Sequence, residues 1–391
     1  MNYSFANRVN TLQPSVIREI LKYSSVPGMI SFAAGNPAPE AFPADEIAAI
    51  SAKIYAERPI DALQYSVTEG YNPLREAIRE RYSFLFGEND QVIITSGAQQ
   101  VMELTTKSLC NEGDVIICEA PTFIGSLNAF RSYNTKLVGI PMENDGMDLN
   151  ALEDALKNNA NVRFIYCIPN FQNPSGIVTS LEKRIGIYAL AKKYDVMILE
   201  DNPYGDTRWE GEEIPSIKSM DTDCRVIYAG TFSKVVSPGM RVGYGIAPAP
   251  VIAKMTVCKQ VSDVHTGIYN QMIVHQFMTG DTYDAHLAHI KEVYRKKSSL
   301  MTSLIDIELA PRISYIKPSG GLFIWCTLPE QIDMLSFCKE AVNRKVAVVP
   351  GSAFLVNESD PCSCIRLNFS TPTDEQIEQG MKVLGELLSE Y

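Results

Sequence analysis

A unit that recurs through the first 234 residues limits the fold more than any other feature of this sequence. Each unit is a short apolar run that ends in small or polar residues and leads into a stretch of helical character. The runs are VIITSGAQQ (92–100), DVIICEAPTF (114–123), VRFIYCIPN (162–170), DVMILEDNPY (195–204) and RVIYAGTFSK (225–234). Segments such as VIIC and VMIL are apolar at successive positions, which is typical of strands covered on both faces. The sequence therefore predicts an α/β fold with an open, mostly parallel sheet flanked by helices.

The pattern changes after about residue 275. Long helical stretches are predicted at 282–306, 331–344 and 373–389, around the short strands GGLFIWCTL and CIRLNFS. With 391 residues the chain is long enough for two domains. We expect a large domain over residues 51–275 and a smaller α+β domain formed by residues 276–391 together with residues 1–50.

Composition and charge exclude several classes of protein. The 46 acidic residues outnumber the 35 basic ones, giving a net charge of -11, and no Lys/Arg block would attract a nucleic acid. No run of about 18 apolar residues predicts a membrane span, and the N-terminus lacks the pattern of a secretory signal. The nine cysteines lie scattered in apolar runs, as free thiols of a reducing compartment do. We therefore expect a cytoplasmic protein, and no metal site, because the histidines and cysteines lack ligand spacing.

Polar residues follow the predicted strands at their carboxyl ends, where open α/β sheets bind ligands. SGAQQ places small residues at a strand-to-helix turn, whose free N–H groups and helix dipole suit a phosphate. The other side chains at these ends are Asn173, Asp201, Tyr204, Thr231, Ser233, Lys234 and, a little further on, Arg241. Each motif alone also suits an ordinary cap or turn. Their order and shared location indicate one small-molecule site.

Six motifs, in order, resemble a known family. LQYSVTEGYNPLREAI, SGAQQ, NPSG, DNPYGD, TFSKVVSPGMRVGY and IRLNFS are similar to motifs of the class I/II aminotransferases of fold type I, which depend on pyridoxal 5'-phosphate (PLP). The opening SVIREILKYSSVPGMISFAAGNPAPEAFP resembles the branch that contains 2-aminoadipate, kynurenine and aromatic aminotransferases and the catalytic part of MocR-type regulators. The resemblance implies transfer of an amino group between an L-amino acid (aminoadipate, aromatic or aliphatic) and a 2-oxo acid such as 2-oxoglutarate. It also implies a homodimer with shared active sites.

The resemblance assigns the catalytic roles to three residues. Lys234 would hold the cofactor as a Schiff base and, once freed, would carry a proton at the substrate Cα. Asp201 would face the pyridine nitrogen and keep it protonated. Tyr204, together with Asn173, would bond the phenolic oxygen of the ring, although simple packing beside Pro203 also explains this tyrosine.

The resemblance also surrounds the cofactor with binding groups. Those for the phosphate would be the backbone of Ala98 and Gln99, the hydroxyls of Thr231 and Ser233, and the guanidinium of Arg241. Tyr65, in LQYSVTEG, matches a residue that reaches the phosphate from the neighbouring subunit. Phe123, in EAPTF, matches the aromatic that stacks on the ring, with core packing as the competing explanation.

Substrate binding is assigned to four residues. Arg366 lies in the apolar run CIRLNFS, where an unpaired charge is costly, and the resemblance gives it the substrate α-carboxylate as partner. Asn173 is also expected to bind the substrate. Gly35 belongs to a lid segment in which Ala34 replaces a glycine that is frequent in the family. Arg18 matches a position that can meet an acidic substrate side chain, or it pairs with a nearby Glu such as Glu19.

Two alternatives remain open at this stage. One is a PLP-dependent lyase or synthase, which shares the lysine, the aspartate and the phosphate groups. The other is a cofactor-binding regulatory module, although the catalytic-type motif SVIREIL already begins near residue 15 and leaves little room for a DNA-binding domain before it.

Overall fold

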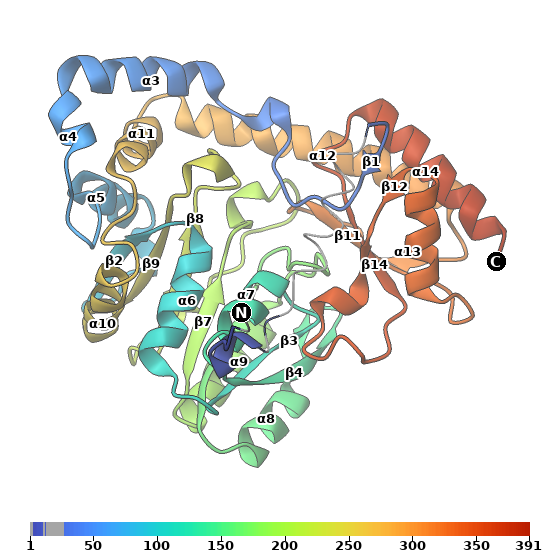
Figure 1. Ribbon diagram of the computed structural model, residues 1–391, viewed down its shortest axis with the longest axis horizontal. Helices are drawn as coiled ribbons and strands as arrows, with labels where there is room; N and C mark the ends of the chain where they lie inside the picture. The colour runs from blue at the N-terminus through green and yellow to red at the C-terminus, as the bar shows by residue number, and fades with distance from the viewer. Residues whose placement is uncertain (1–2, 11, 13–26) are drawn as a thin grey trace.

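The protein is described from a computed structural model that covers residues 3–10, 12 and 27–391. Arg18, the proposed contact of an acidic substrate side chain, lies outside these residues. Figure 1 shows a large central sheet, a second sheet beside it, and helices around both.

The central sheet has eight strands in the order β2-β9-β8-β7-β6-β3-β4-β5 (Figure 1). Its members are β2 (Asp90–Thr95), β3 (Val115–Ala120), β4 (Lys136–Glu143), β5 (Gly146–Met147), β6 (Val162–Cys167), β7 (Met197–Asp201), β8 (Val226–Thr231) and β9 (Gly243–Pro248). The strands from β8 through β7, β6 and β3 to β4 are parallel, whereas β9 is antiparallel to both β8 and β2. This confirms the predicted mostly parallel sheet.

Helices cover both faces of this sheet, which explains the continuously apolar strands. One face packs against α6 (Ala98–Leu109), α7 (Ile124–Arg131) and α10 (Ala249–Gln260). Part of the other face packs against α8 (Leu149–Asn158) and α9 (Leu181–Lys193). Neighbouring strand residues such as Ile116 and Ile117 therefore enter different cores, and both are fully buried.

Strand β4 was not predicted, and its sequence explains why. KLVGIPME contains Gly139 and Pro141, two residues that strands disfavour, and most of its side chains are only half-buried or exposed. The strand lies near the sheet edge, where it pairs with β3 and with the two-residue β5. Pairing with β3, rather than an apolar run of its own, holds it in the sheet.

The second sheet comes from the C-terminal part of the chain and has the order β10-β11-β14-β13. These strands are β10 (Ser314–Tyr315), β11 (Phe323–Thr327), β13 (Val349–Pro350) and β14 (Cys364–Asn368), and all pairs are antiparallel. A separate parallel pair joins β1 (Ile30–Ser31) to β12 (Val346–Ala347). The predicted strands GGLFIWCTL and CIRLNFS correspond to β11 and β14, and the N-terminal segment joins this part of the molecule.

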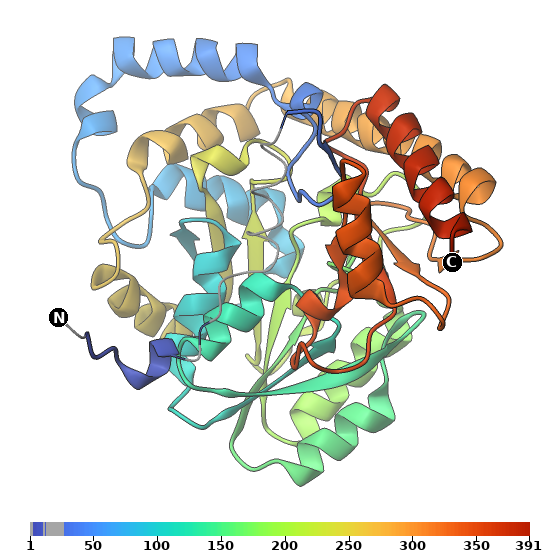
Figure 2. The same cartoon turned by 45° about the vertical axis from the view of Figure 1, so that its right-hand side comes forward.

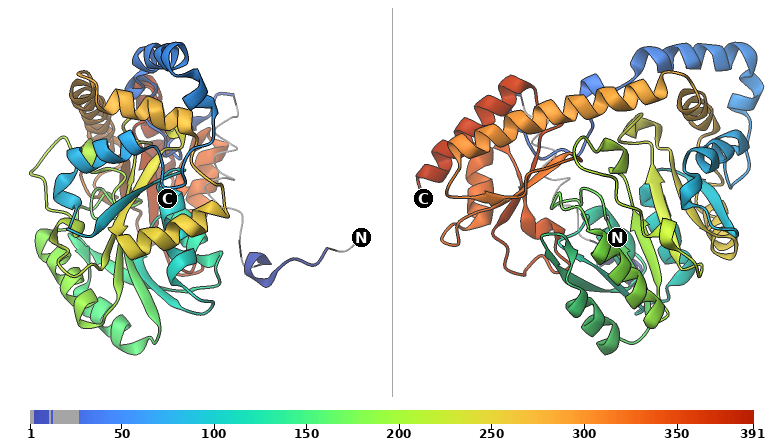
Figure 3. Two further views of the ribbon diagram at one scale, coloured as in Figure 1. Left: turned by 90° about the vertical axis from the view of Figure 1, so that its left-hand side faces the viewer. Right: turned by 180° about the vertical axis from the view of Figure 1, so that it is seen from behind.

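The predicted C-terminal helices are α12 (Tyr283–Glu308), α13 (Met334–Asn343) and α14 (Asp374–Ser389). Seen from behind, α12 extends from beside the central sheet to α14 (Figure 3). The remaining described helices are α1 (Asn7–Asn10), α3 (Ala44–Glu57), α4 (Pro59–Leu63), α5 (Asn72–Arg81) and α11 (Ile268–Met278). No helix in the described ranges has both the length and the apolar character that crossing a membrane requires.

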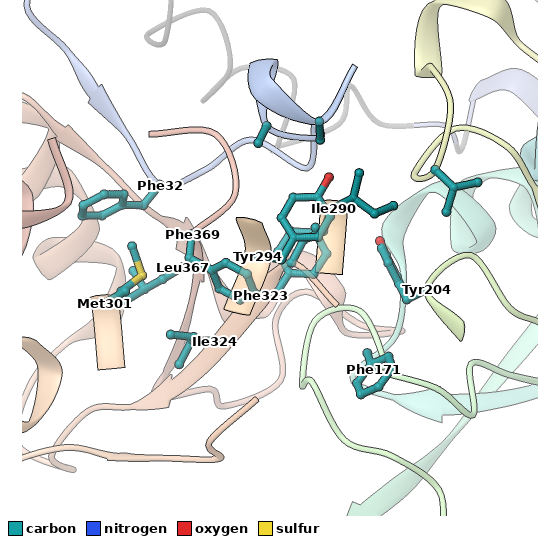
Figure 4. Packing of buried hydrophobic residues seen from close by; sticks show 14 of the residues in the cluster. Phe32, Phe171, Tyr204, Ile290, Tyr294, Met301, Phe323, Ile324, Leu367 and Phe369 are labelled. Carbon is teal, nitrogen blue, oxygen red and sulfur yellow. The ribbon is translucent and has the colours of Figure 1, made fainter. Parts of the chain in front are cut away.

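A single apolar core joins the two sheets. Ile290 and Tyr294 of α12 pack with Phe323 of β11, while Tyr204 follows β7 of the central sheet (Figure 4). Figure 2 shows the second sheet and α13 in front of the parallel strands. The carboxyl ends of those strands therefore lie at the junction of the two sheets.

Candidate active site

A cavity of about 330 Å³ lies at this junction. It brings together nearly all of the predicted site residues, which come from distant parts of the chain. These are Gly35, Ala98, Gln99, Phe123, Asn173, Asp201, Tyr204, Thr231, Ser233, Lys234, Arg241 and Arg366. Its size is that of a small-molecule site.

Lys234 follows β8 and projects its amine into the cavity. The Nζ donates a hydrogen bond to the backbone oxygen of Gly35 at 2.8 Å, and it lies 6.0 Å from the ring centroid of Tyr204. Burial lowers the pKa of Lys234 to about 8, and the positive charges of Arg366 and Arg241 act in the same direction. An amine with this pKa is partly neutral at physiological pH, as a nucleophile or a base must be.

Asp201 ends β7 and holds one carboxylate oxygen without a partner. Its Oδ2 accepts a hydrogen bond from the Tyr166 hydroxyl at 2.8 Å, and that hydroxyl accepts one from Ser126 Oγ at 2.7 Å. The Oδ1 atom is buried and has no protein hydrogen-bond partner. Burial raises the pKa of Asp201 to about 7, while the Tyr166 bond opposes this. A buried free oxygen on a carboxylate fits a cationic N–H donor on a ligand.

Arg366 is a buried cation with no carboxylate beside it among the residues described. Its two terminal nitrogens donate to Asn173 Oδ1 at 2.9 Å and to the Ala33 carbonyl at 2.8 Å, while Nε has no partner. The guanidinium lies 4.1 Å from the ring centroid of Phe323 and 5.0 Å from that of Phe354. Burial lowers the pKa of Arg366 to about 10. These contacts hold the Arg366 guanidinium in the cavity as a buried cation that the carboxylate of a ligand would neutralise.

An anion site surrounds the start of α6. Gly97 precedes the helix with φ 84°, no side chain caps the first N–H groups, and Ala98 and Gln99 open the helix. A side chain at Gly97 would collide with the guanidinium of Arg241, which donates to the Ser96 carbonyl at 3.0 Å and to Ser233 Oγ at 3.5 Å. Free helix N–H groups beside an arginine and hydroxyls suit a phosphate.

An ion pair between the buried Lys259 and the exposed Asp263 supports the turn that forms this anion site. The Lys259 ammonium lies 2.8 Å from Asp263 and 2.7 Å from the side-chain oxygen of Gln100. Asp263 also accepts a hydrogen bond from Ser96 Oγ at 3.0 Å, and Gln100 Oε1 accepts one from the Ser96 backbone N–H at 2.8 Å. Sequence reasoning missed this network, because Lys259 reads as an ordinary helix lysine until its burial is known.

One predicted residue, Tyr65, does not line the cavity. Tyr65 lies on the outside of this subunit with 82% of its surface exposed, and its ring contacts His265 at a centroid distance of 5.8 Å. Arg18 lies outside the described residues. Among the residues that the structure describes, the cavity of one chain is therefore assembled without Tyr65.

Several contributors to the site were not predicted. Asn36, Met102 and Phe323 line the cavity, and Tyr166 orients Asp201 from behind. Tyr166 is the one hydroxyl-bearing side chain in the apolar run FIYC, which was its available signal. Phe323 could not be identified, since its role depends on the stacking of Arg366 across two strands.

These groups fit PLP. Lys234 offers an amine of lowered pKa, Asp201 offers a free buried carboxylate oxygen for a protonated ring nitrogen, and Arg241 helps to form an anion site.

Comparison with known proteins agrees with this chemistry. The model of the family "Aminotransferase class I and II" matches residues 27–384. An aromatic-amino-acid aminotransferase of Thermococcus litoralis is 38% identical, covering 99% of this chain and 94% of the relative. A 2-aminoadipate transaminase of Thermus thermophilus is 36% identical, covering 98% of this chain and 96% of the relative.

A solved kynurenine aminotransferase of Pyrococcus horikoshii, in complex with PMP, superposes with a TM-score of 0.94 at 34% identity, covering 99% of this chain and 97% of that one. The solved α-aminoadipate aminotransferase of Thermus thermophilus, complexed with N-(5'-phosphopyridoxyl)-L-leucine, superposes with a TM-score of 0.90 at 35% identity. The match covers 99% of this chain and 97% of that one. The chain belongs to the class I and II aminotransferase family and is a PLP-dependent aminotransferase of fold type I.

Proposed function

We propose that the enzyme transfers the amino group of an L-amino acid with an aminoadipate-type, aromatic or aliphatic side chain to a 2-oxo acid such as 2-oxoglutarate. The observation that carries the proposal is the convergence of the Lys234 amine, the free Oδ1 of Asp201 and the unpaired Arg366 guanidinium on one cavity. Relatives named for aromatic amino acids and 2-aminoadipate, and a neighbour that binds a leucine adduct, support this range of donors.

PLP, when bound, supplies an aldehyde that condenses with amines and a ring that withdraws electrons from the substrate Cα. Asp201 would hold the ring nitrogen in its protonated form through Oδ1, while Tyr166 fixes the other oxygen. Lys234 would bind the cofactor and would then accept and return the proton at the substrate Cα. Its lowered pKa supports both roles, because a neutral amine is needed for each.

Arg366 would bind the substrate α-carboxylate and so fix the direction of the Cα bonds. Asn173 already accepts a hydrogen bond from its guanidinium, which links the substrate-binding group to the predicted contact of the ring oxygen. Tyr204 lies edge-on to Phe323 at a centroid distance of 5.9 Å, and burial raises its pKa, so it would act as a neutral hydrogen-bond donor. Gly35 would line the substrate side, where its carbonyl now accepts from Lys234.

The remaining groups would anchor the cofactor. The backbone of Ala98 and Gln99, the side chains of Thr231 and Ser233, and Arg241 would bind the phosphate. Thr231 Oγ1 donates to Ser233 Oγ at 3.0 Å, so the two hydroxyls already lie together. Phe123 lines the cavity and also packs against two apolar clusters, which is compatible with both stacking on the ring and core packing.

The proposal includes a homodimer in which Tyr65 reaches the phosphate of the other subunit. Tyr65 is exposed together with the neighbouring apolar side chains Ile60, Leu63 and Val67, as a surface that docks on a second copy requires. Helix α1 stands away from the body in the left view of Figure 3, and Tyr3 and Phe5, which precede it, are exposed. Cytoplasmic location is proposed as well, since all nine cysteines are free.

The first experiment is the visible absorption spectrum of the PLP-loaded enzyme, recorded before and after single amino acids are added without any 2-oxo acid. A donor is expected to bleach the band of the bound cofactor and to release one equivalent of its 2-oxo acid, and 2-oxoglutarate should restore the band. A persistent band with release of ammonia or of a cleaved side chain would replace transamination by a lyase reaction. Absence of a band would remove the assigned roles of Lys234 and Asp201.

Shared active sites can be tested separately by mixing subunits that carry Lys234→Ala with subunits that carry Tyr65→Ala. If Tyr65 serves the neighbouring site, each hybrid dimer contains one site with both residues intact, and high-affinity PLP binding with activity returns on mixing. If Tyr65 serves its own subunit, no hybrid site is intact and mixing restores nothing.

A further inference from the structure

A second cavity, of about 460 Å³, lies directly beside the active site. Pro203 and Thr231 line both cavities, and Asn202, which follows Asp201, lines the second. None of the roles described above uses this space. Its volume is within the range of pockets that hold small molecules.

One wall of this cavity is a ladder of tyrosine rings. Tyr82 and Tyr244 are nearly parallel, with centroids 5.8 Å apart and planes at 25°, and Tyr244 continues to Tyr228 at 6.3 Å and 30°. Gly230 permits this arrangement, because a side chain there would collide with the Tyr244 ring. Phe84 extends the wall to the surface, where 62% of it is exposed. A wall of flat rings with an exposed aromatic rim suits a flat apolar group.

The same cavity holds one cation, Arg208, and two carboxylates, Asp206 and Glu213, and no ion pair joins any of the three to another described residue. The half-buried Arg208 forms no ion pair with any described residue; its guanidinium lies 4.7 Å from the Phe171 ring centroid and donates to Asn170 Oδ1 at 3.4 Å. Asp206, also half-buried, accepts from the Tyr82 hydroxyl at 3.0 Å and has no basic side chain within ion-pair distance in the described ranges. Burial lowers the pKa of Arg208 and raises that of Asp206. The charge of Glu213 opposes the effect of burial on the Arg208 pKa and adds to it on the Asp206 pKa. The charges of Arg208 and Asp206 would therefore be stabilised by opposite charges on a ligand.

We propose that this cavity is a second amino-acid site, which binds the zwitterion of a free α-amino acid with a flat apolar side chain. Arg208 pairs with its carboxylate, Asp206 pairs with its ammonium group, and the side chain lies against Tyr82 and Phe84. The residues that line the cavity include no lysine, so the bound amino acid is not a substrate there. The proposal for this second cavity is independent of which amino acid the active site converts.

The test uses the holoenzyme after reduction with borohydride, which fixes the cofactor on Lys234 and blocks exchange with free amino acids. Isothermal titration calorimetry measures the binding of three matched probes: L-phenylalanine, 3-phenylpropionate, which lacks the ammonium group, and phenethylamine, which lacks the carboxylate. Each probe is titrated into the reduced parent enzyme and into Arg366→Met, in which the carboxylate contact of the active site is removed.

One L-phenylalanine is expected to bind per chain in both proteins, and each single-charge probe should bind at least about 30-fold more weakly. Arg208→Met and Asp206→Asn should each weaken L-phenylalanine binding by about 30-fold. Arg208→Lys, which keeps the charge, should restore part of the loss. Arg295→Met, at an exposed arginine paired with Glu292, is the matched control and should bind like the parent.

Three results would overturn the proposal. They are binding that disappears in Arg366→Met, equal binding of 3-phenylpropionate and L-phenylalanine, and unchanged binding in Asp206→Asn with a native melting temperature. None of these results bears on transamination, which the spectrum of the unreduced enzyme reports independently.

Discussion

The two halves of the active site are held in different ways. Lys234 and Asp201 come from the ends of β8 and β7, neighbouring parallel strands of the central sheet, and Asp201 is fixed by Tyr166. Arg366 comes from β14 of the second sheet and is held between the aromatic rings of Phe323 and Phe354, with one nitrogen unpartnered. With the roles proposed above, the first half would fix the groups that act on the cofactor, and the second would hold a cation available for the substrate carboxylate.

Replacing Lys234 by alanine should abolish the transamination that the half of the site on the central sheet supports. We expect the transamination rate to fall by at least about 10⁴-fold, because the covalent anchor and the proton carrier are lost together. Single-turnover assays with saturating PLP measure this loss. Lys382→Ala, at an exposed helix lysine, serves as the control and should keep parental turnover.

Asp201→Asn should have the next largest effect, since it keeps the shape of the side chain and removes its charge. The expected loss in kcat is about 10³-fold, and PLP binding should weaken as well, because the ring nitrogen no longer meets a carboxylate. Stopped-flow absorbance separates the rate of the proton step from cofactor affinity. A variant with unaltered kcat would show that Asp201 serves packing only.

Arg366→Met tests the half of the active site that the second sheet provides. The value of kcat/KM should fall by about 100-fold for every amino acid, while the spectrum and the affinity of bound PLP stay parental. The comparison between the two halves would break down if PLP affinity fell as strongly as kcat/KM. Titration of PLP into the PLP-free apoenzyme, followed by steady-state kinetics, provides both numbers.

Tyr166→Phe should have the smallest effect and should appear as a shift in pH dependence. The Tyr166 hydrogen bond favours the charged carboxylate, so its removal raises the pKa of Asp201 above the value of about 7 in the free protein. PLP affinity, which falls as Asp201 becomes protonated, should therefore begin to fall at a higher pH. At neutral pH the loss should be about tenfold.

PLP dissociation constants between pH 5.5 and 8.5 measure this shift. Tyr188→Phe, which loses a surface hydrogen bond to Asp223, should leave the profile unchanged. An identical profile in Tyr166→Phe would mean that Asp201 does not depend on its partner tyrosine.

The sequence predicted much of the site because strand-end residues carry a local signal. Asp201 and Lys234 each follow a continuous apolar run, and the carboxyl ends of parallel strands meet at one edge. The partners behind them were missed. Tyr166, Ser126 and Lys259 lie in apolar or helical stretches where nothing local distinguishes a polar contact from ordinary packing.

The sequence alone determined the sheet class and the order of the strand-end groups, since these follow from periodicity and residue type over a few neighbours. The roles of the reactive side chains came from the resemblance of its motifs to the aminotransferase family. Only the tertiary structure decided which charges remain unpaired. That Arg366 Nε and Asp201 Oδ1 lack protein partners, and that Arg208 and Asp206 share a second cavity, depends on residues far apart in the chain. Burial and pairing arise from long-range packing, which has no signature within a short stretch of sequence.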